Sequence, residues 1–240
     1  MKRIEIKKLY ENFPEYENKT ITVAGWVKSI RVSKSLAFIN LNDGGCHKGL
    51  QIVVEESIEN FKEVSKQNVG AAIYATGVLT PTPTAKQPFE LKASQISIEG
   101  TSSPEYPLQK KQHSLEFLRS IAHLRPRTNT FAAAFRVRSV CAQAIHEFFH
   151  ENNFCYVHTP IITASDCEGA GEMFRVTTLD PLNPPLTENG NVDFSADFFG
   201  RPTNLTVSGQ LEGELAATAL GEIYTFGPTF RAENSNTPRH

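Results

Sequence analysis

The sequence has no long apolar run. No stretch of its 240 residues approaches the roughly 20 consecutive apolar residues that a membrane-spanning helix requires. The first residues, MKRIEIKKLYENF, mix both charge signs and contain no apolar segment of the kind found in secretory signal peptides. We therefore expect a protein without membrane segments or a signal peptide.

Cysteine is scarce, and no Cys-x-x-Cys spacing occurs. The chain has four cysteines, Cys46, Cys141, Cys155 and Cys167. Since close cysteine pairs are typical of zinc and redox sites, their absence favours reduced cysteines in small core positions over zinc ligands or disulfides. We assign no metal ligands within the chain, and a cytoplasmic enzyme fits this pattern.

The sequence also lacks a strong overall charge. Its net charge is −2, and 40% hydrophobic residues suffice for a sizeable globular core. One segment differs: residues 110–138 contain two lysines, five arginines and one glutamate, a local charge of +6. Such a segment can be a phosphate-facing surface or simply a solvated helix face, and charge alone does not decide between them.

Residues 1–104 are predicted to form an all-β domain interrupted by one helix. Segments rich in β-branched and aromatic residues alternate with polar turns, and apolar residues at helical spacing follow the third segment. The predicted strands are 20–30, 36–41, 50–54, 71–79 and 89–98, and the helix is 57–68. Five strands with a helix after the third indicate an OB-fold barrel, which commonly holds single-stranded nucleic acid.

The remainder has mixed α and β character, so we predict an α+β protein. Residues 105–130 are expected to form a hinge, and 131–240 a second domain. Within that domain, periodic phenylalanines predict an amphipathic helix that starts at Phe131 and ends at Asn152–Asn153. Further predictions are strands at 154–157 and 223–230, a helix at 211–220, and an insertion loop at 180–201.

Three barrel residues are candidates for contact with a base. Phe38 has a ring that can stack on a base, while Arg31 and Gln51 offer hydrogen-bonding groups for a base edge or a phosphate. The alternative for Phe38 is a core position in an alternating strand.

Two charged residues follow the last predicted strand. Arg231 can grip phosphate oxygens with two nitrogens, and Glu233, two residues on, would point to the same side of a strand. The alternative is an Arg–Glu pair across neighbouring strands.

The segment Ser208–Glu214 begins the helix predicted near the C-terminal end. Ser208 is a predicted N-cap. Glu212 and Glu214 are two residues apart, so at most one of them is expected to point into a site. Earlier in the chain, residues 166–172 form a glycine-rich acidic loop that is either a mobile lid or a surface turn.

Taken in order, these motifs resemble the class II aminoacyl-tRNA synthetases of the aspartate/asparagine/lysine subgroup. Residues 154–162 resemble their motif 1, which ends in a proline, and the Phe-Arg-Ala-Glu sequence at 230–233 resembles motif 2. Three stretches, 117–128, 205–211 and 230–240, resemble the asparagine-specific members of bacterial or organellar type. The resemblance covers essentially the whole chain.

The resemblance implies a role for each matching residue, with ATP, Mg²⁺, L-asparagine and tRNA(Asn) as cofactors and partners. Arg231 would hold the ATP α-phosphate, Glu233 the adenine, and His240 would lie near the β- and γ-phosphates. Glu168, Ser208, Gln210 and Glu214 would bind the amino acid; Arg31, Phe38 and Gln51 would bind the anticodon; and Pro160 would belong to a homodimer interface.

The amino-acid specificity also has a chemical argument. Aspartate-specific relatives have a lysine at the position of Gly213, so the cation that would pair with a substrate carboxylate is missing here. A carboxylate buried without its partner is unfavourable, whereas a carboxamide can donate a hydrogen bond to Glu214. This favours asparagine over aspartate.

The sequence ends before motif 3, so we expect a truncated form that lacks activity by itself. There are three alternatives: an aspartate-activating relative, an enzyme of amino-acid synthesis with the same catalytic fold, and a non-catalytic tRNA- or RNA-binding module.

Overall fold

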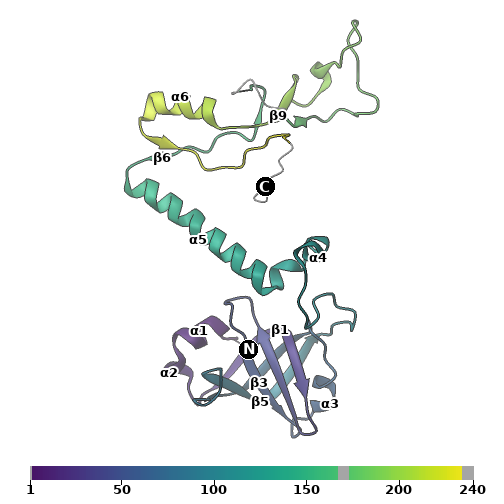
Figure 1. Ribbon diagram of the computed structural model, residues 1–240, viewed down its shortest axis with the longest axis vertical. Coiled ribbons are helices and arrows are strands. Elements are labelled where there is room, and N and C mark those ends of the chain that lie inside the picture. Colours follow the sequence, from purple (N-terminus) through teal and green to yellow (C-terminus); the bar gives the residue numbers. More distant parts are fainter. Residues whose placement is uncertain (1, 167–172, 234–240) are drawn as a thin grey trace. The chain divides into compact units, whose positions relative to one another are not determined.

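The structure is a computed structural model that describes residues 2–166 and 173–233 (Figure 1). The chain divides into two compact units, residues 1–139 and 140–240, and the division falls inside a helix, α5 (Asn129–Glu151). The two units are described separately below.

The first unit is built on the predicted five-stranded barrel, which is confirmed. Its strands are β1 (Thr20–Val32), β2 (Leu36–Asn42), β3 (Leu50–Glu55), β4 (Ala72–Pro81) and β5 (Phe89–Gly100). They close in the order β1-β2-β3-β5-β4. Neighbouring strands are antiparallel except β3 and β5, which are parallel and pair through only two residue pairs, Ile52–Leu91 and Val53–Lys92.

The barrel core follows from alternation along the strands. In β2, for example, Ala37, Ile39 and Leu41 are fully buried because alternate residues of a strand point to the same face. The same core contains Phe89, the bulkiest fully buried side chain. The inward faces are therefore apolar, and the outward faces remain available for polar contacts.

One helix interrupts the strands after β3, as predicted, but residues 1–104 also contain two helices that were not predicted. Two short helices, α1 (Ile6–Glu11) and α2 (Phe13–Tyr16), precede the barrel and lie together along one flank of it (Figure 1). Phe13 stacks on Phe89 with ring centroids 4.9 Å apart, which anchors these helices on the core. The predicted helix at 57–68 is shorter than expected, since only α3 (Phe61–Val64) forms.

Residues 105–130, which were predicted to be a hinge, contain local structure that the sequence pattern did not predict. Helix α4 (Leu115–Ser120) begins after Ser114, whose hydroxyl accepts a hydrogen bond from the Phe117 amide. A 3-10 turn, η1 (Arg125–Arg127), then leads to α5. Residues 101–113 form neither helix nor strand.

Helix α5 confirms the predicted long helix and begins two residues earlier than expected. Asn153, just beyond its end, has φ +63°, the left-handed conformation that asparagine tolerates at helix termini. None of its residues is buried, so its apolar face is exposed in this chain. No helix in the described part of the chain is both long enough and apolar enough to cross a membrane.

The second unit has two small sheets. One pairs β6 (Cys155–Tyr156) with β10 (Ile223–Tyr224) in parallel, and the other is antiparallel with the order β7-β9-β8. The three strands of the latter sheet are β7 (Ile162–Thr163), β9 (Thr203–Leu205) and β8 (Arg175–Val176). Tyr224 stacks on Phe149 of α5 at 4.4 Å, which fixes β10 against the end of that helix.

Other predictions in this unit are confirmed only in part. Helix α6 (Gln210–Leu220) matches the predicted helix, but the strand predicted at 223–230 ends at Tyr224, because β10 pairs only with the two-residue β6. The insertion loop is irregular apart from a short 3-10 turn, η2 (Phe194–Ala196), and an isolated bridge between Leu186 and Val192. The thiols of Cys46, Cys141 and Cys155 are free, whereas Cys167 lies outside the described residues.

A buried carboxylate holds the insertion loop together. The Asp197 side chain accepts hydrogen bonds from the Thr177 hydroxyl at 2.6 Å, from the hydroxyl and amide of Thr178 at 2.7 and 2.9 Å, and from the Phe198 amide at 2.7 Å. These donors favour the ionised form, the Thr177 hydroxyl most of all, and hold the Asp197 pKa well below its usual range.

Replacing Asp197 by Asn should lower the thermal unfolding temperature of the second unit by a few degrees at pH 7. Because the folded pKa is depressed, the contribution of the carboxylate is complete above the ordinary aspartate pKa of about 3.9 and is lost as the pH falls below it. Circular dichroism melts at pH 7, 5 and 3 should show the gap between wild type and D197N narrowing towards pH 3. Glu188→Gln, an exposed change in the same loop, is the control; a gap independent of pH would contradict the expectation.

Candidate functional site

The barrel brings its three candidate residues together. Arg31, Phe38 and Gln51 line one cavity of about 400 Å³ on the β1-β2-β3 wall, with Val32 and Ser33 completing its lining. Arg31 lies directly opposite Phe38 in the β1–β2 pairing, and Gln51 lies opposite Asn40 in the β2–β3 pairing. The cross-strand register therefore gathers a cation, a ring and a carboxamide on one surface.

Phe38 faces outward, so the alternative that it is a core residue is wrong. Its neighbours Ala37 and Ile39 are fully buried, and Phe38 itself is partly exposed. A further residue belongs to this surface, since Gln51 Nε2 donates a hydrogen bond to Glu90 Oε2 at 3.1 Å. Glu90 comes from β5, and the sequence offered no signal that would pair it with Gln51.

In the second unit, backbone hydrogen bonds bring three segments of the predicted site together. The Thr206 amide donates to the Ile161 carbonyl at 2.8 Å, and the Phe230 amide donates to the Thr206 carbonyl at 2.9 Å. The segments that contain Pro160, Ser208 and Arg231 are therefore neighbours, although about 70 residues separate the first from the last.

The start of α6 is arranged differently from the prediction. Gly209, not Ser208, is the N-cap residue, and the Ser208 hydroxyl accepts a hydrogen bond from the Gln210 amide at 3.1 Å. Gly209 packs closely on the segment before Pro160, since a Cβ atom at this position would lie 2.5 Å from Thr159 Oγ1. A larger residue at position 209 would therefore have to displace the Thr159 side chain.

Gln210 and Glu214 act as a pair on one face of α6. Gln210 Nε2 donates to Glu214 Oε1 at 2.8 Å, and both side chains line a cavity of about 420 Å³. Glu212 does not line that cavity, which agrees with the expectation that only one of the two glutamates points into a site. The cavity lining contains Glu222 as a second carboxylate and neither lysine nor arginine.

Gly213 is buried between Gln210 and Glu214 in this cavity. A Cβ atom there would meet Thr225 Cγ2 at 3.5 Å and Ile223 Cδ1 at 3.7 Å, which is ordinary van der Waals contact. A side chain at position 213 would therefore start towards the Ile223–Thr225 segment.

Arg231 and Glu233 lie in an irregular, exposed segment. The argument that both point to one side of a strand is wrong, because no strand extends past Tyr224 here. The two side chains instead approach each other directly, with Arg231 Nη1 3.9 Å from Glu233 Oε1. The predicted alternative of a pair across two strands is wrong for the same reason.

The other predicted residues have less structural support. Glu168 and His240 lie outside the described residues. Pro160 is exposed, as are the two isoleucines that follow it, Ile161 and Ile162. In the described part of the chain, no cluster of three or more His, Cys, Asp or Glu side chains could hold a metal ion.

Comparison with known families gives both parts of the chain a match. Residues 21–99 match the OB-fold nucleic acid binding domain, and residues 114–240, more than half of the chain, match the tRNA synthetases class II (D, K and N). The chain belongs to this family of class II tRNA synthetases. The resemblance noted in the sequence and the predicted α+β fold class are thereby confirmed.

Individual relatives of this class II synthetase chain are closely similar over its full length. Proteins named asparagine–tRNA ligase from Acetivibrio thermocellus and Clostridium tetani are 66% and 61% identical to it, and each match covers 100% of this chain and 52% of the relative. The chain thus spans about half the length of these relatives.

Solved structures agree with the fold. The asparaginyl-tRNA synthetase of Pyrococcus horikoshii, complexed with asparaginyl-adenylate, matches with a TM-score of 0.82 and 23% identity, over 100% of this chain and 50% of that one. The enzyme of the same name from Entamoeba histolytica matches with a TM-score of 0.74 and 22% identity, over 93% of this chain and 48% of that one.

Alanine at Gly209 and at Gly213 should have opposite effects on the stability of the second unit. Gly209→Ala forces a Cβ against Thr159 and should cost about 1–3 kcal/mol, as overpacking does. Gly213→Ala fits and should gain about 0.5–1 kcal/mol, because glycine is unfavourable inside a helix. Urea unfolding followed by circular dichroism measures both, and equal effects would contradict the close approach at Gly209.

Proposed function

We propose that this chain is the first part of an asparagine–tRNA ligase, which activates L-asparagine with ATP and transfers it to tRNA(Asn). The observation that carries the proposal is the α6 cavity, where the Gln210–Glu214 pair flanks the buried Gly213 and the lining holds no cation. The side-chain carboxylate of aspartate would meet Glu214 and Glu222 there without a counter-charge. The side-chain carboxamide of asparagine can instead donate a hydrogen bond to one of these carboxylates. The names of the 66% and 61% identical relatives support the same substrate.

The chemistry requires positioning and charge neutralisation rather than a side-chain nucleophile. The asparagine carboxylate attacks the ATP α-phosphorus, forming asparaginyl-adenylate and releasing pyrophosphate; a terminal ribose hydroxyl of the tRNA then displaces AMP. Arg231 is proposed to hold the α-phosphate and to stabilise the charge that builds on its oxygens. Phosphoryl transfer generally uses Mg²⁺, which is commonly held by one or two carboxylates together with the phosphates of the nucleotide.

The remaining binding roles are also proposals. Glu233 would accept a hydrogen bond from the adenine amino group, and its exposed carboxylate beside Arg231 is compatible with one nucleotide contacting both. Ser208 and Gln210, together with Glu168, would bind the amino acid, and His240 would lie near the outer phosphates.

Arginine 231 should be essential for adenylate formation. A hybrid in which this chain is completed by the remaining part of the Acetivibrio thermocellus relative should catalyse ATP–pyrophosphate exchange that depends on asparagine. Arg231→Ala should reduce this exchange by at least about 100-fold, the loss typical of removing one donor to a developing anion. Arg201→Ala, at an exposed arginine of the insertion loop, should leave it unchanged.

Two results would contradict the proposal. Equal ATP–pyrophosphate exchange with aspartate and asparagine would contradict the proposed specificity for asparagine. Full exchange activity of the R231A hybrid would contradict the role of Arg231 in the nucleotide site.

The barrel is proposed to bind the anticodon of tRNA(Asn) through Arg31, Phe38 and Gln51. The outward ring of Phe38 offers a stacking surface, and the Arg31 guanidinium opposite it can contact a base edge or phosphate. Glu90 would orient the Gln51 carboxamide by the hydrogen bond between them. This gives the barrel a recognition role that is separate from the activation chemistry.

Phe38→Ala should weaken binding of the 240-residue chain to a tRNA(Asn) anticodon stem-loop. Loss of one base–aromatic stack costs about 1–3 kcal/mol, equivalent to roughly 5- to 150-fold in affinity. A gel-shift titration measures this, with Phe198→Ala, an exposed phenylalanine of the second unit, as the control. Unchanged binding by F38A would exclude Phe38 from the RNA surface.

Three further assignments belong to this proposal. We take residues 1–104 as the anticodon-binding domain, 105–130 as the hinge and 131–240 as the first half of the catalytic domain. The exposed Pro160–Ile162 segment is proposed to join two copies in a homodimer. A cytoplasmic location is consistent with the three free thiols among the described residues.

A further inference from the structure

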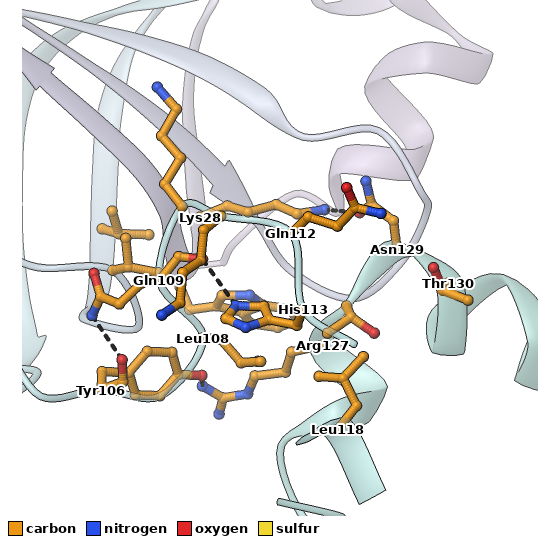
Figure 2. A pocket seen from close by; sticks show the side chains of 16 residues that line it. Lys28, Tyr106, Leu108, Gln109, Gln112, His113, Leu118, Arg127, Asn129 and Thr130 are labelled. Atoms are coloured by element: carbon orange, nitrogen blue, oxygen red, sulfur yellow. Dashed lines mark hydrogen bonds between the residues drawn. The ribbon is translucent and has the colours of Figure 1, made fainter. Parts of the chain in front are cut away.

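A cavity of about 600 Å³ lies in the first unit and shares no lining residue with the Arg31–Phe38 surface (Figure 2). Most of its lining comes from three segments, with Val69 and Leu118 in addition. The segments are Trp26–Lys28 of β1, Tyr106 with residues 108–113, and residues 127–130 at the start of α5. Its volume falls within the range of about 300–1,000 Å³ that small-molecule sites occupy.

The cavity lining is strongly basic. It includes Lys28, Lys110, Lys111 and Arg127, together with His113, and it contains no aspartate or glutamate. Lys110, Lys111 and Arg127 belong to the basic segment at 110–138, whose role the sequence left open. Four cationic side chains around one cavity without a carboxylate favour an anionic ligand.

One of these cations is held in place before any ligand binds. The Arg127 guanidinium lies 5.3 Å from the centre of the Trp26 ring, and its Nη1 donates to the Tyr106 hydroxyl at 3.1 Å. A guanidinium fixed in this way loses little conformational freedom on binding, which is the advantage of a preorganised site. The two aromatic rings also give the cavity flat apolar surfaces.

Lys28 adds a half-buried cation to the wall. Its ammonium group donates to Asn129 Oδ1 at 2.5 Å, and burial lowers its pKa. An anion in the cavity would offset this burial, because a nearby negative charge favours the protonated amine. Asn129 and Thr130, the first two residues of α5, also line the cavity, and amides at these positions have no partner within a helix.

We propose that this cavity binds a small phosphorylated molecule that carries a planar ring, of which a nucleoside monophosphate is the simplest example. The phosphate would be held by the lysines and Arg127, and the ring would pack on Trp26 or Tyr106. The site involves none of the residues at 208–233, so it does not depend on the function proposed above.

Ligand binding can be followed by tryptophan fluorescence, because Trp26 is the single tryptophan of the chain and lines the cavity. Titration of the 240-residue protein with AMP should change its tryptophan fluorescence and give a saturable isotherm by calorimetry. Adenosine and inorganic phosphate, each carrying half of the ligand chemistry, should each bind at least about tenfold more weakly.

Neutralising two lysines of the cavity lining tests whether AMP binds at this cavity. The double variant K110Q/K111Q should bind AMP at least about tenfold more weakly, because two charge-assisted contacts are lost. The control K62Q/K66Q removes the same charge from exposed lysines outside the cavity lining and should bind normally. The same loss should appear when K110Q/K111Q is compared with its parent in an Arg231→Ala background, which separates this cavity from the proposed ATP site.

Several outcomes would overturn the inference. Equal affinity for AMP and inorganic phosphate would reduce the cavity to a general anion site. Binding of a 12-nucleotide RNA without any binding of AMP would assign the lysines to a nucleic-acid surface. Absence of binding, or equal loss in both double variants, would remove the site altogether.

Discussion

The second unit depends on the backbone of one buried residue, Thr206. Its amide donates to Ile161 and its carbonyl accepts from Phe230, so a single residue joins the segments on both sides of it. Apolar packing contributes little to the stability of this unit. Among its described residues, the buried apolar side chains are those of Val207 and Tyr224. Hydrogen bonds therefore set the relative positions of the Pro160, Ser208 and Arg231 segments more than core packing does.

Elements whose conformation is determined by their own residues could be predicted from the sequence, whereas elements that depend on a partner segment could not. The barrel strands were predicted because alternation and turn residues are encoded within each strand. Helices α1 and α2 were missed because six and four residues are too few for a periodic pattern. The strand predicted at 223–230 was wrong, since a strand requires a neighbour to pair with and β6 offers only two residues.

The site shows the same division. Arg31, Phe38 and Gln51 were predicted from residue type and family resemblance, and the register of β1, β2 and β3 gathers them in one cavity. Glu90 and the basic cavity were not predicted, because each is created by chain segments that are distant in sequence. Helical geometry predicted only that at most one of Glu212 and Glu214 faces a site, and the family resemblance favoured Glu214; the cavity lining contains Glu214 and not Glu212.

The short parallel pairing of β3 with β5 makes this the weakest seam of the barrel wall. Two residue pairs join β3 to β5, compared with seven between β1 and β4. We therefore expect local opening of the barrel to begin at this seam. Gln51 and Glu90 bridge that same seam by their side chains. Their hydrogen bond therefore adds a side-chain link across a seam that the backbone closes with only two residue pairs.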